Sequence, residues 1–306
     1  MTVVVFGSIN IDVTAYSERL PRPGETLHGD RHVLGLGGKG ANQAAAAGRL
    51  GAPTSLIGRV GSDPFGAEAR RLLADYGIGE KAILIDDEHG TGIAIIHVEP
   101  SGENAITIIG GANLAMDTTD VERGRSVLEA AKVLLLQLEV PLAASLRAAA
   151  CARAAGARVI FDPAPAPTSE LVPAILAAAD IITPNEIETE ALCGVRPDDT
   201  DSAVQAALLL HGLGAATVLV KLGAKGVLVS TPKTHSLIPA FAVRPVDTVA
   251  AGDCFNGGLA FALARGDDLF AAARFAAACG ALATTRYGAA AAAPTLSEVD
   301  RFVRGA

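Results

Sequence analysis

Tryptophan is absent from this 306-residue sequence, aromatic residues make up only 4% of it, and cysteine occurs four times. The cysteines are scattered, with no C-x-x-C pair and no histidine cluster nearby, so we expect reduced thiols and no zinc site. No uncharged apolar run reaches the length of a membrane span, so none is expected. The first residues lack the pattern of an export signal, and we therefore predict a cytoplasmic protein.

Positive charge is also scarce. The sequence has 25 Lys and Arg against 33 Asp and Glu, and its net charge of −8 argues against nucleic acid as the main partner. Lysine is the rarer of the two cations, and it occurs only at Lys39, Lys81, Lys132, Lys221, Lys225 and Lys233. Half of the residues are apolar and only 19% are charged, which excludes a disordered chain.

Short β-rich runs alternate with alanine-rich helical runs along most of the chain. The alternation predicts a mostly parallel sheet covered by helices on both faces, an α/β fold of three layers in one domain over residues 1–306. The expected strands are 3–6, 55–60, 133–136, 158–161, 181–183 and 217–220, and the clearest helices are 41–50, 64–76 and 141–155.

Four segments that resemble strands break this alternation, near 10–16, 30–36, 91–98 and 104–110. No helix separates the first two, and the last two form a hairpin pattern around a Pro-Ser-Gly turn. We therefore predict a small antiparallel sheet inserted in the domain. Such a sheet can serve as a lid over a cleft or as a dimer surface.

A first glycine-rich loop, residues 35–42, leads directly into a helix. Its glycines satisfy G-x-G-x-x-G by letter, but that fingerprint belongs after the first strand, and the loop lysine is not followed by Ser or Thr as in a phosphate loop. A helix entry that needs glycine dihedrals explains the glycines equally well. Lys39 and Asn42 beside bare backbone amides favour a polar site for hydroxyls or an anion.

A second loop, residues 247–258, places small residues, Gly252 and Asp253 at the start of a long predicted helix. An aspartate that caps the helix is the simpler interpretation. Together, however, free amides at a helix start can stabilise a transferring phosphoryl group, and the carboxylate can accept a proton from an attacking hydroxyl. Asp247 adds a second carboxylate to the loop.

Two further segments follow predicted strands at the edge where α/β sheets bind ligands. Asn185, Glu186 and Glu188 offer oxygen ligands suited to hydrated Mg²⁺, although taken alone they are better explained as capping residues of a surface helix. The segment 222–226 is a tight turn that would let backbone approach a nucleotide, although a turn without a ligand is the simpler interpretation.

These motifs together resemble the PfkB family of carbohydrate kinases, and within it the ribokinases. The resemblance extends over essentially the whole chain, from residues 7–12 through 23–26, 37–43 and 183–186 to 247–248 and 251–257. It implies a ribokinase-like three-layer fold with a β-sheet lid, dependence on ATP and Mg²⁺, and activation by K⁺. It also implies a lid-mediated homodimer and transfer of the γ-phosphoryl group to the primary 5-hydroxyl of D-ribose.

The resemblance also implies roles for individual residues. Asp253 matches the catalytic base, and the amides of Ala250, Ala251 and Gly252 match the anion hole. The matching sugar ligands are Asn10, Asp12, Gly38, Lys39, Gly40, Ala41, Asn42 and Glu139, with Ala94, Ile96 and Ile108 of the lid above them. The matching nucleotide positions are Asn185, Lys221, Leu222, Gly223, Ala224, Lys225, Gly226, Gly252 and Ala277. Asn185 and Glu188 match positions that organise Mg²⁺ through water, and the monovalent-cation positions are Asp247, Val249, Ala283, Arg286, Gly288 and Ala292.

Four positions depart from the commonest family pattern. Cys254 stands where Thr is usual, Lys221 where Thr is frequent, Ala277 where His or Asn is frequent, and Ala292 where a Ser hydroxyl can complete the potassium shell. Two alternatives stay open beside D-ribose phosphorylation. One is a kinase of the same family acting on deoxyribose, a ketohexose or adenosine. The other is a regulator on the same fold that binds sugar or nucleotide without catalysis.

Overall fold

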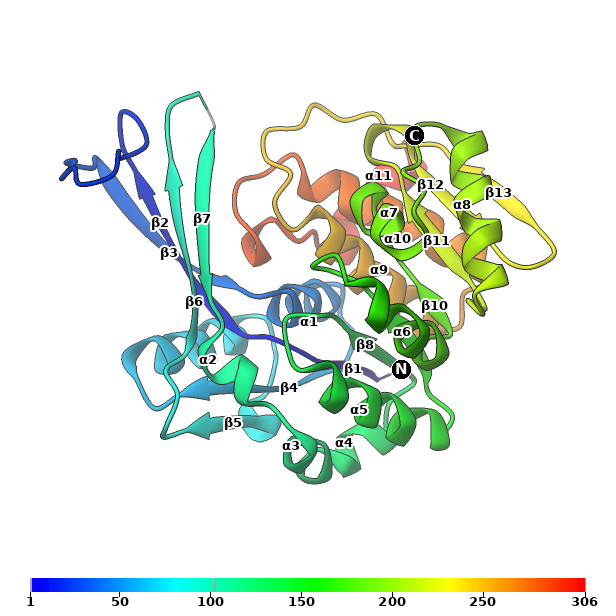
Figure 1. The fold of residues 1–306 in the computed structure, drawn as a ribbon, viewed down its shortest axis with the longest axis horizontal. Helices are drawn as coiled ribbons and strands as arrows, with labels where there is room; N and C mark the ends of the chain where they lie inside the picture. Colours follow the sequence, from blue (N-terminus) through cyan, green and yellow to red (C-terminus); the bar gives the residue numbers. More distant parts are fainter. Residues whose placement is uncertain (1, 102, 306) are drawn as a thin grey trace.

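The computed structural model describes residues 2–101 and 103–305, which form a nine-stranded sheet with helices on both faces and a smaller sheet beside it (Figure 1). The strand order is β13-β12-β11-β10-β9-β8-β1-β4-β5. All neighbours from β5 to β11 are parallel, and β12 and β13 are antiparallel. The strands are β1 Val3–Phe6, β4 Thr54–Gly61, β5 Ile83–Asp86, β8 Val133–Leu136, β9 Arg158–Phe161, β10 Ile181–Ile182, β11 Val218–Lys221, β12 Val227–Ser230 and β13 His235–Ile238.

This arrangement confirms the predicted three-layer α/β fold. The bounds of β1, β8 and β9 agree with the expected strands, whereas β5, β12 and β13 were missed. The helices are α1 Lys39–Arg49, α2 Pro64–Asp75, α3 Thr118–Arg123, α4 Arg125–Glu129, α5 Leu142–Ala154, α6 Val172–Ala178, α7 Glu186–Cys193, α8 Thr200–Gly212, α9 Ala251–Arg265, α10 Leu269–Ala283 and α11 Leu296–Arg304. Short 3₁₀ turns lie at Glu80–Ala82, Gly111–Ala115, Ser169–Leu171, Gly223–Lys225 and Ala290–Ala292. None of the helices within residues 2–101 and 103–305 is both long and apolar enough to cross a lipid bilayer.

The two faces of the sheet carry different helices. In β1, Val3 and Val5 belong to a core shared with α1, α2, α9, α10 and α11, whereas Val4 and Phe6 belong to a core shared with α3 to α8. Successive side chains of a strand point to opposite faces, so a continuous apolar strand buried between two helical layers follows from the sequence.

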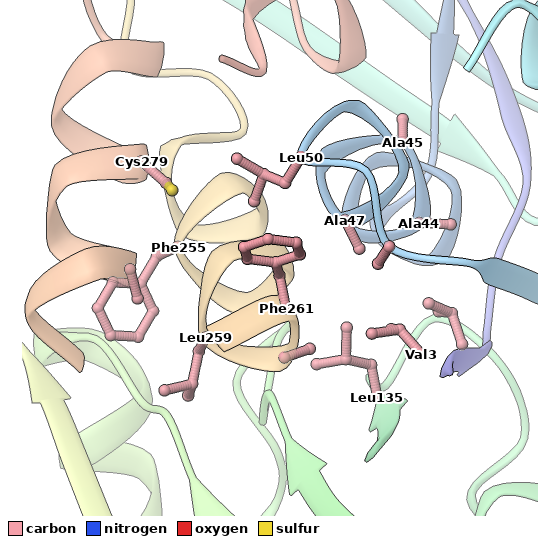
Figure 2. Packing of buried hydrophobic residues seen from close by; sticks show 14 of the residues in the cluster. Val3, Ala44, Ala45, Ala47, Leu50, Leu135, Phe255, Leu259, Phe261 and Cys279 are labelled. Carbon is pink, nitrogen blue, oxygen red and sulfur yellow. The ribbon is translucent and has the colours of Figure 1, made fainter. Parts of the chain in front are cut away.

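Small residues bring α1 and α9 close together, and this contact positions the site described below. Ala44, Ala45 and Ala47 of α1 lie in one core with Phe261 of α9 (Figure 2). A Cβ on Gly257 of α9 would lie 2.6 Å from the Cβ of Ala46 and 2.8 Å from the backbone oxygen of residue 43. Only glycine fits there, and its place holds the start of α9 against the start of α1.

The second sheet has four strands in the order β3-β2-β6-β7, and we call it the lid sheet. Its strands are β2 Asn10–Tyr16, β3 Arg31–Gly37, β6 Gly92–Val98 and β7 Asn104–Ile109, which confirms the four predicted segments. The β2–β3 and β6–β7 pairs are antiparallel as expected. The central β2–β6 pair runs parallel, because β2 and β6 both lead outward from the main body (Figure 1).

Candidate active site

At the start of α9 the amides of Gly252 and Asp253 have no hydrogen-bond partner among the described residues, whereas the Ala251 amide donates to the Thr248 carbonyl (3.3 Å). The N-cap residue of α9, Ala250, has φ 56°, the only left-handed non-glycine residue among residues 2–101 and 103–305, and no side chain caps the helix. A helix that begins without a cap exposes N–H groups at its positive end. The strained backbone at Ala250 and the open amides next to Gly252 are the features that an anion hole needs.

Asp253 lies in the first turn of this helix and is buried. Its Oδ2 accepts a hydrogen bond of 3.1 Å from Asn42 Nδ2, and its Oδ1 accepts one of 3.1 Å from Gln43 Nε2, both on α1. Burial raises the pKa of Asp253 to about 6, against the lowering effects of Lys39 and of these two hydrogen bonds. A carboxylate with that pKa is mostly ionised at pH 7 and accepts a proton more readily than an ordinary aspartate.

The lysine of the first glycine-rich loop, Lys39, points into this group of carboxylates. Burial alone would lower its pKa, but the charges of Asp253, Asp162 and Glu139 hold that pKa above its ordinary range. No carboxylate oxygen of the described residues lies within 4.0 Å of its ammonium. The cation is therefore charged and free to bind an incoming polar ligand.

Several backbone amides of the same loop already have partners within the protein. The amide of Lys39 donates to Glu139 Oε2 (2.9 Å), that of Gly40 to Ser8 Oγ (3.2 Å), and that of Ala41 to the Ser8 carbonyl (2.9 Å). Glu139 also accepts a bond of 2.6 Å from Ser8 Oγ. Its carboxylate caps α1, and the groups of this loop that remain available to a ligand include the Lys39 ammonium and the Asn42 Oδ1 atom.

Asn10 and Asp12 lie at the start of β2. Asn10 is buried, and its Oδ1 accepts a bond of 2.7 Å from Asn113 Nδ2, while Asn113 also bonds to the backbone N and O of residue 9. The pKa of Asp12 is raised to about 6, first by burial and then by the charges of Glu139 and Asp253. A Cβ on Gly37 would lie 1.9 Å from Asp12 Oδ1, so this glycine makes room for the carboxylate. Sequence reasoning missed Asn113.

The predicted lid contacts share one face with Asp12. Asp12 pairs with Ala94 on β6, and Ala94 pairs with Ile108 on β7, while Ile96 lies two residues further along β6. Directly paired residues and residues two apart point to the same side of a sheet. Ala94 is buried, Ile96 is half-buried, and Ile108 is 59% exposed, so this face is apolar and becomes more open toward the tip of the lid.

A second group of charges lies at the carboxyl ends of β9 and β11. Lys221 Nζ is 3.0 Å from Asp162 Oδ1 and 4.0 Å from Glu188 Oε2. Asp162 is buried, and its Oδ2 accepts a bond of 3.0 Å from Gln43 Nε2, the same amide group that binds Asp253. Asp162 and Gln43 were not predicted. The signal for Asp162 was its position immediately after the strand 158–161, at the ligand-binding edge of the sheet.

Asn185 and Glu188 cap the start of α7 by bonding to each other's backbone amides, which agrees with their interpretation as capping residues of a helix. Asn185 Oδ1 accepts from the Glu188 amide (2.9 Å), and Glu188 Oε2 accepts from the Asn185 amide (2.7 Å). Burial raises the pKa of Glu188. Within the described residues, no group of three or more His, Cys, Asp or Glu is placed to ligate a metal ion. Each Glu188 oxygen keeps a lone pair, so the pair fits Mg²⁺ held through its coordinated water.

The predicted nucleotide loop is a tight turn between β11 and β12. The amide of Leu222 donates to the Gly226 carbonyl (2.8 Å), and residues 223–225 form a 3₁₀ turn that contains Ala224. Gly226 has φ 107°, and a Cβ there would lie 2.0 Å from the backbone oxygen of residue 238. Lys225 Nζ donates to the Asp198 carbonyl, just before the start of α8. Ala277 is half-buried on α10.

The structure also brings together the two segments predicted to hold a monovalent cation. Asp247 Oδ2 accepts a bond of 3.0 Å from the Gly288 amide, its Oδ1 accepts one of 3.0 Å from the Val249 amide, and its own amide donates to the Thr284 carbonyl. Ala283 and Ala292, which lie within five residues of Gly288 in the sequence, are fully buried. The Arg286 side chain forms an ion pair of 2.6 Å with Glu298.

The model of the pfkB family of carbohydrate kinases matches residues 1–296. The chain belongs to this family. It is 41% identical to a ribokinase of Haemophilus influenzae, with 100% of this chain and 99% of that protein covered. The crystal structure of a Thermotoga maritima ribokinase superposes with a TM-score of 0.90 at 34% identity, covering 99% of each chain. An Arabidopsis thaliana ribokinase solved with ribose and ATP has a TM-score of 0.88 at 33% identity, covering 99% of this chain and 98% of that one.

Proposed function

We propose that this pfkB-family chain transfers the γ-phosphoryl group of ATP to the 5-hydroxyl of D-ribose, giving D-ribose 5-phosphate and ADP. The observation that carries the proposal is Asp253, a buried carboxylate with a pKa of about 6 at an uncapped helix start, between the sugar ligands and the nucleotide loop. The similarity to ribokinases over the full chain, including one solved with ribose and ATP, supports this acceptor and this donor.

The acceptor site is built from side chains that match the hydroxyls of a small sugar. Asn10, Asp12 and Lys39 supply an amide, a carboxylate and an ammonium. The Oδ1 atom of buried Asn42 has no hydrogen-bond donor among the described residues, so it is free to accept from a hydroxyl. A buried polar group of this kind discriminates strongly, because an analogue without the hydroxyl leaves it unpaired.

In the reaction, Asp253 takes the proton of the attacking hydroxyl as the sugar oxygen bonds to phosphorus. The open amide of Gly252 stabilises the charge on the transferring group, and the lid sheet excludes water that would otherwise hydrolyse ATP. Mg²⁺, when bound, neutralises phosphate charge, and Asn185 and Glu188 would hold it through water. We also propose a monovalent-cation site on the backbone of Asp247, Val249, Ala283, Arg286, Gly288 and Ala292.

The lid sheet also supports a homodimer. Val33 and Ile106 are at least 44% exposed on the face of the sheet that carries Asp12, and Leu34 and Ile109 are at least 44% exposed on the opposite face. Exposed apolar side chains of this size favour a protein partner. Light scattering after gel filtration should give twice the monomer mass, and Ile109→Lys should return it to the monomer mass. A wild-type monomer at micromolar concentration would contradict the dimer.

A coupled ADP-release assay tests the activity directly. We expect the highest kcat/KM with D-ribose in a panel that also contains 2-deoxyribose, fructose and adenosine, and we expect the rate to require Mg²⁺ and to rise with K⁺. A higher kcat/KM for another acceptor would replace D-ribose as the substrate. No ADP release with any acceptor, despite measurable ATP binding, would instead favour a regulator that binds without catalysis.

A further inference from the structure

The ammonium of Lys221 lies beside the anion hole rather than on the outer rim of the nucleotide loop. Lys221 is the last residue of β11, and its side chain is 14% exposed. A Cβ added to Gly252, in the first turn of α9, would lie 3.5 Å from Lys221 Nζ. The ammonium therefore faces the point where the phosphoryl group is expected to move.

This placement brings two positive charges together. The start of α9 carries the positive end of the helix dipole and has no capping side chain. A lysine is normally favourable at the opposite end of a helix, so Lys221 beside Gly252 is unfavourable in the absence of an anion. The carboxylates of Asp162 and Glu188 offset part of this charge from the other side.

A purely structural ion pair with Asp162 would not require this position. Asp162 already accepts a hydrogen bond from Gln43, and its side chain is only 2% exposed, while the Lys221 side chain is 14% exposed and its ammonium also lies next to Gly252. An ammonium beside a helix start with open amides is a favourable place for a group with several negative oxygens.

We propose that Lys221 is a catalytic residue that binds the γ-phosphoryl group of the nucleotide and neutralises it during transfer. The inference rests on the proposed kinase function. As the bond between the sugar oxygen and phosphorus forms, the bond from phosphorus to the β-phosphate oxygen breaks and its electron pair stays on ADP. Asp253 takes the hydroxyl proton, and Lys221 keeps its own protons and donates hydrogen bonds to the phosphoryl oxygens.

The decisive comparison is between Asp162→Asn and the double variant Lys221→Met/Asp162→Asn. Removing Lys221 alone would leave Asp162 buried without its cation and could unfold the chain. In the Asp162→Asn background the lysine has lost its nearest carboxylate, at 3.0 Å, and keeps only the more distant Glu188, at 4.0 Å. We expect the double variant to have a kcat about 10²–10³ lower than Asp162→Asn, the usual loss for one donor to a transition-state oxyanion. Equal kcat values in the two variants would overturn the proposal.

Nucleotide binding without sugar gives a second readout. By calorimetry, the double variant should bind ATP about tenfold more weakly than Asp162→Asn and should bind adenosine equally well, because adenosine has no phosphate. Equal losses for ATP and adenosine would mean a collapsed pocket and would also overturn the proposal. Lys233→Met, an exposed lysine in the turn between β12 and β13, is the matched control and should behave as wild type.

The two proposals fail in different ways. If the wild-type chain phosphorylates no acceptor, the proposed function fails, and the ATP and adenosine titrations still decide the role of Lys221 in phosphate binding. If the wild-type chain phosphorylates D-ribose and the double variant matches Asp162→Asn in both assays, only the inference about Lys221 fails.

Discussion

The charge of Lys39 should set the pH at which Asp253 becomes an effective base. Lys39 is the strongest of the influences that lower the pKa of Asp253, which burial raises to about 6. At that pKa roughly 90% of the carboxyl is ionised at pH 7. Loss of a nearby opposite charge typically moves a carboxyl pKa by about 1–3 units, here upward. With a rise of about 1.5 units, only about a quarter of Asp253 is ionised at pH 7 in Lys39→Met, and almost all of it at pH 9.

The assay is kcat/KM for the sugar measured from pH 5 to pH 9.5. We expect the acid limb of the pH profile to lie near pH 6 in wild type and near pH 7.5 in Lys39→Met. In Lys39→Met, kcat/KM should therefore rise about fourfold between pH 7 and pH 9. Lys39→Arg keeps the charge and should keep the limb near pH 6, while its planar guanidinium should raise the sugar KM by about tenfold.

Asp12 complicates the assignment, because its pKa is also raised to about 6. Asp12→Asn removes that carboxyl, and an acid limb that persists in this variant belongs to Asp253. The reasoning is refuted if Lys39→Met leaves the limb where it is in wild type, or if Lys39→Arg moves it as far as Lys39→Met does.

Three further predictions follow from single contacts. Asp253→Asn should lower kcat by about 10²–10⁴. Because the pKa of Asp253 in the folded protein, about 6, lies above the ordinary value of an aspartate, wild type loses proton-linked stability as the pH rises through about 6. The melting temperature of the variant relative to wild type should therefore increase from pH 5 to pH 8, by the equivalent of roughly 1–2 kcal/mol, and a constant difference would contradict this. Gly40→Ala places a Cβ 2.6 Å from the carbonyl carbon of residue 7 and should lower the free energy of unfolding, measured with urea, by at least about 2 kcal/mol. Gly212→Ala, with open space around it at the end of α8, should raise that free energy by up to about 1 kcal/mol, and equal effects of the two variants would count against the argument. Asn113→Ala should raise the sugar KM by about tenfold and leave the ATP KM unchanged, because Asn113 holds the amide of Asn10; an unchanged sugar KM would show that Asn10 needs no such support.

The central strands were predictable because they are buried on both faces, which requires short continuous apolar runs such as Val3–Phe6 and Val133–Leu136. The strands at the edges of the sheet were not. Ile83–Asp86 ends in a polar residue, and His235–Ile238 begins with two polar residues and buries only Ile238 fully, so neither shows such a run. The parallel β2–β6 pair depends on contacts between segments about 80 residues apart, which local patterns do not encode.

In the candidate site, too, some residues could be predicted from the local sequence and others depend on contacts between distant segments. Asp253 and Asn42 stand in loops whose composition is unusual, so the sequence drew attention to them. Gln43 stands in ordinary surroundings, and it reaches Asp253 because Gly257 allows α9 to approach α1. Asp162 joins the same group through its hydrogen bond with Gln43. The direction of Lys221 could not be predicted either, since a residue at the end of a strand can face the loop or the sheet edge. Its partner Asp162 lies 59 residues away in sequence.

Strand β2 joins the proposed sugar-binding residues Asn10 and Asp12 to the outer part of the lid sheet, and this has a mechanical consequence. Asn10 is fixed in the main body by Asn113, whereas Tyr16 lies six residues further out on the same strand, about 20 Å away. A rigid tilt of about 10° around Asn10 would move Asp12 by about 1 Å and Tyr16 by about 3.5 Å. In such a tilt, Asn10 and Asp12 would hardly move because they lie next to the centre of rotation, whereas the outer end of the strand would move several times further. The entrance could open for exchange of sugar and product while the polar contacts stay nearly in place.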